Sequence, residues 1–502
     1  MHLLAQAVPD ESISIGWFDL SPLIILVAGA LGLMVVGALT PMWPKSLYAF
    51  VSAATAGATG VMAIVLWDDI SDQGSATLVE GALAFDTFAM WSTITISAAV
   101  LLVSLLTDQY LRGTPNDGPE VYALYLVAAA GGITMAAAND LIVLFLGLET
   151  LSLALYVLAA SNRRRDDSAE SGLKYFVLGG FASAFFLYGI ALVYGGTGST
   201  NIREMVDNVA AGVSSDGDVL TLAGSALLMV GLGFKVAAAP FHVWTPDVYQ
   251  GAPSPVTACM ASAGKAAAFG AVIRVLVSGL PGFRDDWRPI VWVLAVASLV
   301  IGSFLAVVQS DVKRMLAYSS ISHAGFLLVG VEAAGHTAGE FETGLGVSSV
   351  QLYLLLYAVL VIGSFGVVTI VAGDEPATLD TFKGLARRKP VVAVAFTVFL
   401  LAQAGVPFTS GFVAKFGVIQ AAVSENSYAI AIIAMVAAVV AAFLYLRIMV
   451  SMWLHDPADA NDTVTVPFSA GTAIAVAALF TVAVGIYPSW LIDLSDAVTL
   501  VR

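Results

Sequence analysis

Long apolar stretches alternate with short polar links along nearly the whole chain. Each stretch has about 20 residues, which is enough for one helix to cross a bilayer core about 30 Å thick. This pattern predicts fourteen membrane-spanning helices, near residues 19–41, 46–67, 82–106, 119–137, 139–160, 171–195, 217–240, 254–279, 287–308, 313–333, 348–373, 391–420, 427–453 and 466–490. The longer link at 196–216 is polar and mixed, and we expect a short surface helix there.

The composition places the chain among all-α polytopic membrane proteins. Of its 502 residues 59% are apolar and 11% are charged, with a mean hydropathy of +0.90, whereas soluble proteins have about 25% charged residues. The single cysteine, Cys259, excludes a disulfide framework and a cysteine metal site. The net charge of -15 argues against nucleic acid as a partner. The first residues lack the basic region and cleavage site of a signal peptide, so we expect the first helix to be retained.

Lysine and arginine gather on one side of the predicted membrane. The larger set comprises Lys45, Arg112, Arg163, Arg164, Arg165, Lys174, Lys313, Arg314, Lys383, Arg387, Arg388 and Lys389. The other side has only Arg203, Arg284, Arg288 and Arg502. The positive-inside rule places the larger set in the cytoplasm. We therefore expect both termini on the outer side of a bacterial cytoplasmic membrane, as an even number of spans requires.

Two spans are interrupted by a proline-aromatic pair. The first break is Pro240-Phe241, in KVAAAPFHVW, and the second is Pro407-Phe408, in QAGVPFTSGFVAKF. Interrupted helices at corresponding places in two halves are typical of a transporter repeat with functional sites near the membrane midplane. The predicted organisation is two inverted five-helix units, 119–279 and 287–453, flanked by an N-terminal region, 1–118, and a C-terminal region, 454–502. Apart from the Pro-Phe pairs, the two units share little sequence identity.

A carboxylate and a lysine lie at membrane depth in the first unit. Glu149, in LFLGLETLSLALYVL, is about ten residues into its span and so about 15 Å deep. Burial favours the neutral amine of Lys235 and a nearby carboxylate favours the ammonium, so moving the carboxylate would load or unload a proton. The alternatives are a static ion pair or a protonated hydrogen-bond donor at Glu149, and a Lys235 that extends to the membrane surface.

Two further lysines extend this pattern. Lys265, in ASAGKAAAFGAV, is surrounded by small residues that favour close helix packing, so we expect it to face the bundle. Lys415 follows the second break by eight residues. Ionisable residues are rare at membrane depth and usually mark ion or proton pathways. The set predicts a row of titratable groups with water between them.

The remaining polar residues leave alternatives open. His242 follows the first break and His323 lies among serines in AYSSISHAGFLLVG; each could relay protons or bond to a backbone carbonyl. Lys174 could extend to the surface or take up protons for a relay. Asp86 starts an apolar run and is expected to be a residue at a helix end. The other histidines are expected in loops or at the surface: His2, His336 and His455.

Motifs for nucleotide and redox cofactors are absent from the sequence. It contains no Walker A motif, no GxGxxG that opens a helix after a strand, no HExxH and no cysteine pattern for an iron–sulfur cluster. We therefore expect no cofactor or metal on this chain. Its energy would come from an ion gradient or from a partner.

Four segments carry a family resemblance: GLETLSLALYVL, SAESGLKYFVLGGFASAFFLYGIALVYGGTGS, FKVAAAPFHVWTPDVYQGAPSPVTACMASAGKAAAF and LAYSSISHAGFLLVG. They resemble subunit N of bacterial NADH-quinone oxidoreductase, respiratory complex I, and DVYQGAPSPVTA is the most specific part. The similarity runs from the third to the thirteenth span. It implies a fourteen-helix, antiporter-like proton channel with a broken helix in each unit. It also implies that Glu149, Lys235, Lys265 and Lys415 translocate protons, with Lys174 and His323 as possible relay residues.

The resemblance further implies a coupling mechanism. Quinone reduction elsewhere would move Glu149 electrostatically relative to Lys235, and Lys265 and Lys415 would pass the proton outward. Unit charges about 4 Å apart interact by roughly 4 kcal/mol at an effective dielectric of about 20, which is sufficient to switch a lysine. Flavin, iron–sulfur clusters and quinone would belong to other subunits. The partners would be sibling antiporter-like subunits, small membrane subunits and lipid.

Other functions remain open from the sequence. A subunit of a multisubunit Na+/H+ antiporter would share the helix plan, although DVYQGAPSPVTA argues against it. A scaffold would use its buried charges only to lock helices together. A solute transporter would need a substrate-sized polar cluster, which the sequence does not show.

Overall fold

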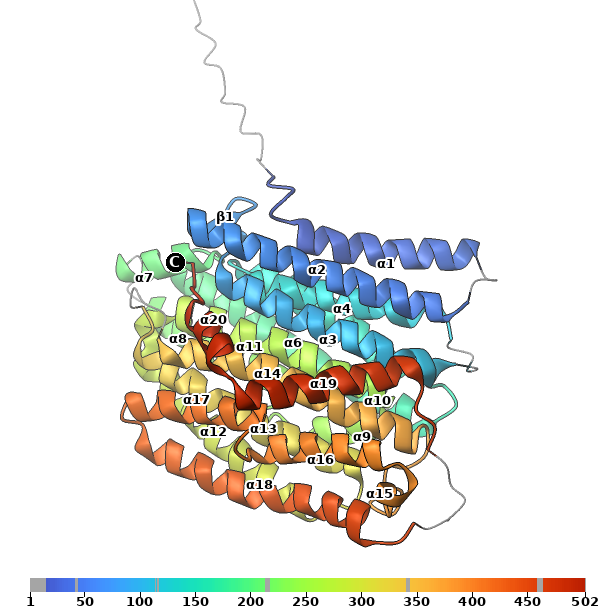
Figure 1. Cartoon of the computed structure of the whole chain (residues 1–502). Coiled ribbons are helices and arrows are strands. Elements are labelled where there is room, and N and C mark those ends of the chain that lie inside the picture. Colours follow the sequence, from blue (N-terminus) through green and yellow to red (C-terminus); the bar gives the residue numbers. More distant parts are fainter. Residues whose placement is uncertain are drawn as a thin grey trace, which may run out of the picture.

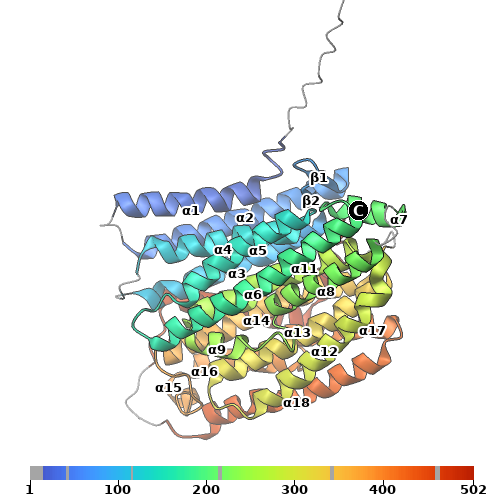
Figure 2. The same cartoon turned by 180° about the vertical axis from the view of Figure 1, so that it is seen from behind.

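The computed structural model describes residues 15–40, 44–112, 114, 117–212, 217–339, 344–457 and 464–501. They form a bundle of long helices that run side by side, with shorter helices and a small hairpin at its two ends (Figures 1 and 2). In both views α1 and α18 lie at opposite edges of the bundle. The chain therefore crosses the bundle from one edge to the other.

The first part of the chain consists of α1 (Ser21–Leu39), α2 (Ser46–Gln73), β1 (Ala76–Leu78), β2 (Leu83–Phe85), α3 (Thr87–Leu111), α4 (Pro119–Ala137), α5 (Leu141–Ala159), α6 (Asp166–Thr197), α7 (Ile202–Ala210), α8 (Gly217–Lys235), α9 (Thr245–Gly251), α10 (Ser254–Cys259) and α11 (Lys265–Ile273). Strands β1 and β2 pair antiparallel, with Thr77 opposite Ala84. Two π-helical turns, Met260–Gly264 and Arg274–Ser278, flank α11. Together α10, α11 and these turns form one continuous buried span.

The second part consists of a short 3₁₀ turn (Pro281–Phe283), α12 (Arg284–Val307), α13 (Val312–His336), α14 (Leu345–Ala372), α15 (Leu385–Arg388), α16 (Pro390–Ala404), α17 (Ser410–Ser424), α18 (Tyr428–Leu454), α19 (Phe468–Ile486) and α20 (Ser489–Asp496). Helix α14 is mostly buried and packs against α3, α13 and α17. The span from α10 to the second π turn packs against α14 as well. These two elements form the centre of the bundle.

All fourteen predicted spans correspond to helices within the described residues, and the predicted fold class is confirmed. Twelve spans are long and apolar enough to cross a membrane as single helices. The others are α13, which carries several charged residues, and the interrupted pair α16 and α17. The surface helix expected within 196–216 is α7. The exact limits of the two five-helix units stay a prediction.

Both predicted breaks are confirmed. Helix α8 ends at Lys235, five residues before Pro240, and α9 begins at Thr245. The freed backbone is satisfied within the protein, as a membrane interior requires: Trp244 Nε1 donates to the Phe234 carbonyl at 3.1 Å and the Ala239 amide donates to Ser298 Oγ at 2.8 Å. The second break separates α16 from α17.

Helices α7 and α15 mark opposite ends of the bundle (Figures 1 and 2). The C-terminus lies at the same end as α7. We call these the α7 end and the α15 end. The arginine-rich link after α5 contacts the segment before α15, since Arg165 Nη1 donates to the Asp374 carbonyl at 2.8 Å. The α15 end is therefore the end that the positive-inside rule assigns to the cytoplasm.

Candidate functional site

Helix α5 presents two polar side chains to its neighbours. Glu149 is half-buried and accepts a short hydrogen bond from Ser183 of α6. Ser152, one turn later, is buried and accepts a hydrogen bond from Lys235 Nζ at 2.7 Å. Within the described chain, Glu149 and Lys235 make no direct ion pair, but the Glu149 charge is close enough to act on the ammonium. The predicted partnership of the two residues through their charges therefore stays a prediction.

Lys235 lies inside the bundle and not at its surface. It is the last residue of α8, where helix carbonyls attract a cation, and it is 8% exposed. Its ammonium is 3.5 Å from the Tyr175 hydroxyl. The rings of Tyr156 and Tyr175 lie 5.8 and 5.5 Å away, within cation–π range. These contacts stabilise a charge without fixing it in an ion pair.

An aromatic bridge leads from Lys235 toward the next lysine. Tyr175 stacks on Trp244 with ring centroids 4.5 Å apart, and Trp244 meets the edge of Tyr249 at 6.1 Å. The Tyr249 hydroxyl interacts with Ser320 of α13. The hydroxyl-bearing rings of Tyr175 and Tyr249 thus lie on either side of the Trp244 ring.

Lys265 faces the bundle, as predicted. It begins α11 directly after a π turn and is 2% exposed. Its ammonium donates to the Ser320 carbonyl at 2.6 Å and to Ser320 Oγ at 2.7 Å. The ring of Tyr357 lies 5.4 Å away. Since Ser320 is neutral, nothing in this contact set holds the lysine permanently charged.

His323 continues the row one turn beyond Ser320 on α13. Its Nδ1 lies 2.6 Å from the Tyr353 hydroxyl and its Nε2 lies 3.4 Å from the Tyr445 hydroxyl. The Tyr445 hydroxyl is in turn 2.6 Å from Ser319 Oγ. Both ring nitrogens thus contact groups that can donate or accept a proton. The described hydrogen bonds of His323 are with side-chain hydroxyls and not with a backbone carbonyl, and its role as a relay stays a prediction.

Lys415 lies at the far end of this network. Its ammonium donates to the carbonyls of Gln403 and Ala404, at 2.8 and 3.1 Å. These are the last carbonyls of α16, so the lysine caps the negative end of the broken helix. The Gln403 side chain accepts from Ser319 at 3.3 Å. A polar network therefore connects His323 to Lys415 across the second break.

Lys174 belongs to an ion-pair group nearer the α15 end. Its ammonium lies 2.7 Å from both Glu170 and Asp247, and Arg314 binds the second oxygen of Asp247 at 2.6 Å. Asp247 lies on α9, in the link between two spans. Burial raises the pKa of its carboxyl, but the ion pairs with Lys174 and Arg314 outweigh burial and lower the pKa. The lysine is 40% exposed, which fits either the surface or the uptake interpretation.

Replacing Asp247 by asparagine is expected to weaken the junction between α6, α9 and α13 by about 1 kcal/mol or less, because the group is partly exposed and screened. Because the pKa of the Asp247 carboxyl is lowered in the folded protein, its charge contributes to stability at pH values above the ordinary carboxyl pKa. The variant should therefore lose this whole contribution at neutral pH. The midpoint of thermal dissociation, compared with that of Asp166→Asn, measures it. A midpoint shift no larger than in Asp166→Asn would show that the ion pairs add no stability.

The remaining histidines have different environments. His242 is half-buried in the first break and interacts with the Pro240 backbone. His336, expected in a loop or at the surface, is the last residue of α13 and its side chain is 23% exposed. Helix α13 extends three residues beyond the predicted span, so His336 is still helical and packs against α12 and Glu332. His455 is exposed, as predicted, and His2 lies outside the described residues.

Sequence reasoning missed two buried cations. Lys313, predicted to begin a span on the cytoplasmic side, is 5% exposed and donates to the Ala252 carbonyl at 2.5 Å. Arg274 binds Asp86 through two bonds of 2.6 Å, and both side chains are almost completely buried. Asp86 also lies at a helix end, as predicted, where it caps α3 by accepting from the Ala89 amide at 2.8 Å. The position of Arg274 inside an apolar stretch could have indicated that it needs a buried acidic partner.

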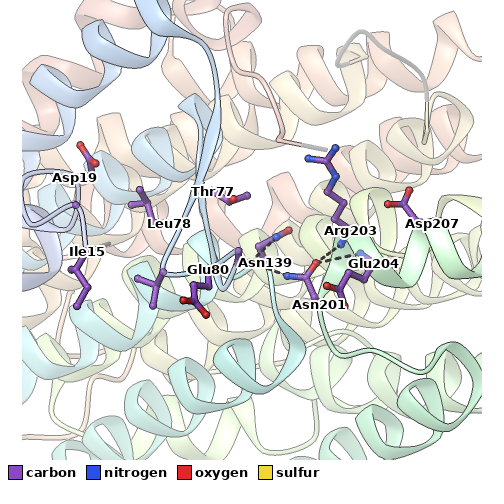
Figure 3. Close-up of a pocket in the computed structure, with 13 residues that line it drawn as sticks. Ile15, Asp19, Thr77, Leu78, Glu80, Asn139, Asn201, Arg203, Glu204 and Asp207 are labelled. Atoms are coloured by element: carbon purple, nitrogen blue, oxygen red, sulfur yellow. Dashed lines mark hydrogen bonds between the residues drawn. The ribbon is translucent and has the colours of Figure 1, made fainter. Parts of the chain in front are cut away.

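A separate open pocket of about 830 Å³ lies at the α7 end. Figure 3 shows Glu80, Asn139, Asn201, Arg203 and Glu204 along it. Its lining includes no residue of the lysine row. The asparagines hold the hairpin turn by donating to the Gly81 carbonyl at 2.8 and 2.9 Å. We assign this pocket no part in the candidate pathway.

Comparison with known proteins identifies relatives over most of the chain. Residues 138–441 match the family described as NADH:quinone oxidoreductase/Mrp antiporter, TM. The chain is 46% identical over 398 residues to NADH-quinone oxidoreductase subunit N of Rhodococcus opacus, covering 78% of this chain and 72% of that protein. In respiratory complex I from Thermus thermophilus, one chain aligns with a TM-score of 0.80 and 30% identity, covering 95% of this chain and 100% of that chain. A chain of the Mrp complex from Dietzia aligns with a TM-score of 0.83 and 22% identity, covering 96% and 97%.

Proposed function

The chain belongs to the NADH:quinone oxidoreductase/Mrp antiporter transmembrane family, and from this we propose that it is a subunit N-type membrane subunit that translocates protons in an NADH-quinone oxidoreductase. The observation that carries the proposal is the row of buried lysines. Each ammonium bonds to a neutral oxygen: Ser152 for Lys235, Ser320 for Lys265 and the Gln403 carbonyl for Lys415. A cation without a carboxylate in contact can lose its proton at a modest cost.

Glu149 supplies the switch in this proposal. Its charge acts on Lys235 without a direct bond, so a change near α5 and α6 alters how firmly Lys235 holds its proton. The proton then moves by way of Lys265, Ser320 and His323 toward Lys415. Lys174 takes up protons from the α15 side. The energy comes from quinone reduction in other subunits, which hold the flavin, the iron–sulfur clusters and the quinone site.

We propose the bacterial cytoplasmic membrane as the location, with both termini outside. The partners are sibling antiporter-like subunits, small membrane subunits and lipid. The likeness to the Mrp complex at 22% identity concerns the fold alone, whereas the 46% identity is to a subunit N. These identities favour the oxidoreductase over the Na+/H+ antiporter. Co-purification of flavin and iron–sulfur subunits with this chain separates the two.

Glu149→Gln tests the switch. We expect the variant to assemble, because glutamine can still accept from Ser183, but to lower the proton-to-electron ratio of NADH oxidation and slow coupled turnover about tenfold. Proton uptake into inverted membrane vesicles and NADH consumption measure both quantities. The exposed Glu375 provides the control, as Glu375→Gln should behave like the wild type. A normal ratio in Glu149→Gln would remove Glu149 from the mechanism.

A further inference from the structure

A second group of ionisable side chains lies at the α7 end, outside the lysine row. It consists of Arg288 of α12, Glu332 and His336 of α13, and Glu425 and Ser427 after α17, and we call it the α7-end cluster. Glu332 Oε1 lies 3.3 Å from Arg288 Nη2, from His336 Nε2 and from Ser427 Oγ. The Glu332 side chain is only 5% exposed. Arg288 and Ser427 can donate to this buried carboxylate oxygen, whereas His336 Nε2 can do so only when it carries a proton.

The other oxygen of the same carboxylate is free to take a proton. Among the described residues Glu332 Oε2 has no hydrogen-bond partner, although it is buried. A buried polar atom without a partner is costly and calls for an explanation. A proton on Oε2 would neutralise the carboxyl and so lower the cost of burying it. The geometry therefore presents Oε2 as a proton-accepting atom.

His336 is arranged to take the proton onward. Its Nε2 lies 2.5 Å from Arg288 Nη2, a group that can only donate, so Nε2 accepts there and the neutral ring carries its proton on Nδ1. Nδ1 is 3.9 Å from Glu425 Oε2, and Glu425 is 30% exposed. A proton arriving at Nε2 would displace Arg288, which also lies 3.7 Å from the exposed Asp285. The contacts therefore allow two arrangements: Arg288 donates to a neutral His336, or Arg288 pairs with Asp285 while His336 is protonated.

The cluster lies directly beyond Lys415 on the way to the α7 end. Glu332 follows His323 by nine residues on α13, which is about 13 Å, and Glu425 follows Lys415 by ten, about 15 Å. Between them α13 packs closely on both α14 and α17 at Gly330, where an added Cβ would lie 2.5 Å from Val350 Cγ2 and 3.0 Å from Val418 Cγ1. The two helices that carry the end of the lysine row therefore also carry the cluster.

We propose that the α7-end cluster is the site where protons leave the pathway on the outer side, which rests on the proton-translocating function proposed above. The N–H bond of the Lys415 ammonium breaks and water carries the proton to Glu332 Oε2, forming an O–H bond. The protonated carboxyl then rotates so that this O–H takes the place of Oε1, which lies 3.3 Å from His336 Nε2. The O–H bond breaks as an N–H bond forms at Nε2, while Arg288 moves toward Asp285. The proton on His336 Nδ1 is lost beside Glu425 to the outer solvent, which leaves a neutral ring with its proton on Nε2. A flip of the ring exchanges the two nitrogens, so that Arg288 can return and the cycle can repeat.

Glu332→Gln in the native membrane tests this site against Lys415→Met and Asp286→Asn. Asp286 is exposed on the same helix end as Arg288 and is the control. In inverted vesicles the outer face meets the lumen, so we expect Glu332→Gln to lower the proton-to-electron ratio as much as Lys415→Met does. The wild-type rate of proton accumulation should fall as the preset lumen pH is lowered, because a cluster that already holds a proton cannot receive the next one. Glu332→Gln should lose that dependence, and Glu332→Asp should restore it.

The outcomes separate the two proposals. If Lys415→Met leaves the ratio unchanged, the proton-translocating function itself fails. If Lys415→Met lowers the ratio but Glu332→Gln keeps the wild-type ratio and pH profile, release at the cluster is wrong. If Glu332→Gln does not assemble, His336→Gln decides, because this residue is at the rim: a lowered ratio with a flattened pH profile supports the site, and a wild-type profile overturns it.

Discussion

Replacement of Lys235 by methionine is expected to leave the complex assembled and to lower proton translocation and coupled turnover at least about tenfold. Methionine keeps most of the length and packing of the side chain but cannot hold a proton. Positioned acid–base groups contribute about 10²–10⁴-fold to proton transfer, so the loss of one should dominate the rate. The aromatic pocket of Tyr156, Tyr175 and Trp244 can receive the thioether without a buried charge.

The measurement combines NADH-driven quinone reduction, proton uptake into inverted vesicles and native gels. Lys383→Met is the matched control, because Lys383 is a partly exposed lysine paired with Asp380 near α15. An assembled Lys235→Met complex with a normal proton-to-electron ratio would contradict the mechanism. Failure to assemble, with a normal Lys383→Met, would show that Lys235 is structural and leave the functional case to Glu149 and Lys415.

Asp86→Asn is expected to be the most destabilising of the conservative substitutions considered. It leaves Arg274 charged and buried with no carboxylate, a situation that costs about 3–5 kcal/mol. The asparagine side chain would still cap α3, so the loss reports mainly on the ion pair. The C-terminal tail should loosen at the same time, since the Val501 amide donates to Asp86 Oδ2 at 2.8 Å. We expect much less assembled complex and a lower midpoint of thermal dissociation.

Two further variants show whether the ion pair is responsible. Asp167→Asn removes one partner of an exposed pair with Arg165 and should change stability by about 1 kcal/mol or less. The double variant Asp86→Asn with Arg274→Met removes both charges and should recover part of the stability, because the buried charge is gone. Equal loss in the single and double variants would assign the effect to packing around Asp86.

The fold was largely predictable because the membrane imposes it. Apolar length, proline breaks and basic links act locally and can be read without tertiary contacts, which is why all the spans correspond to helices. The exact break at Lys235 was less predictable. Helix α8 ends where Trp244 and Ser298 can satisfy the freed backbone, and these partners come from outside the helix.

The charged residues of the candidate site could be predicted from the sequence, but their hydrogen-bond partners could not. A lysine in an apolar stretch is visible in the sequence, and Lys265 and Lys415 lie buried as expected. Their serine and carbonyl partners depend on how α13 and α16 pack, which no spacing reveals. The same limitation explains Lys313 and His336. Each is near a predicted helix end, and only the neighbouring helix decides whether it is buried.

Two π-helical turns flank α11, and they help to set the directions in which Lys265 and Arg274 project from this span. A π turn contains one more residue than the α-helical turn it replaces, and each residue of an α-helix accounts for about 100° of rotation. Deleting one residue from Met260–Gly264 would rotate the preceding part of the span relative to the rest by that angle. Lys265 and Arg274 would then have to leave Ser320 and Asp86, or α10 would have to turn. The number of residues in this span therefore matters as much as its two buried cations. An insertion or deletion here should be harder to tolerate than a point substitution.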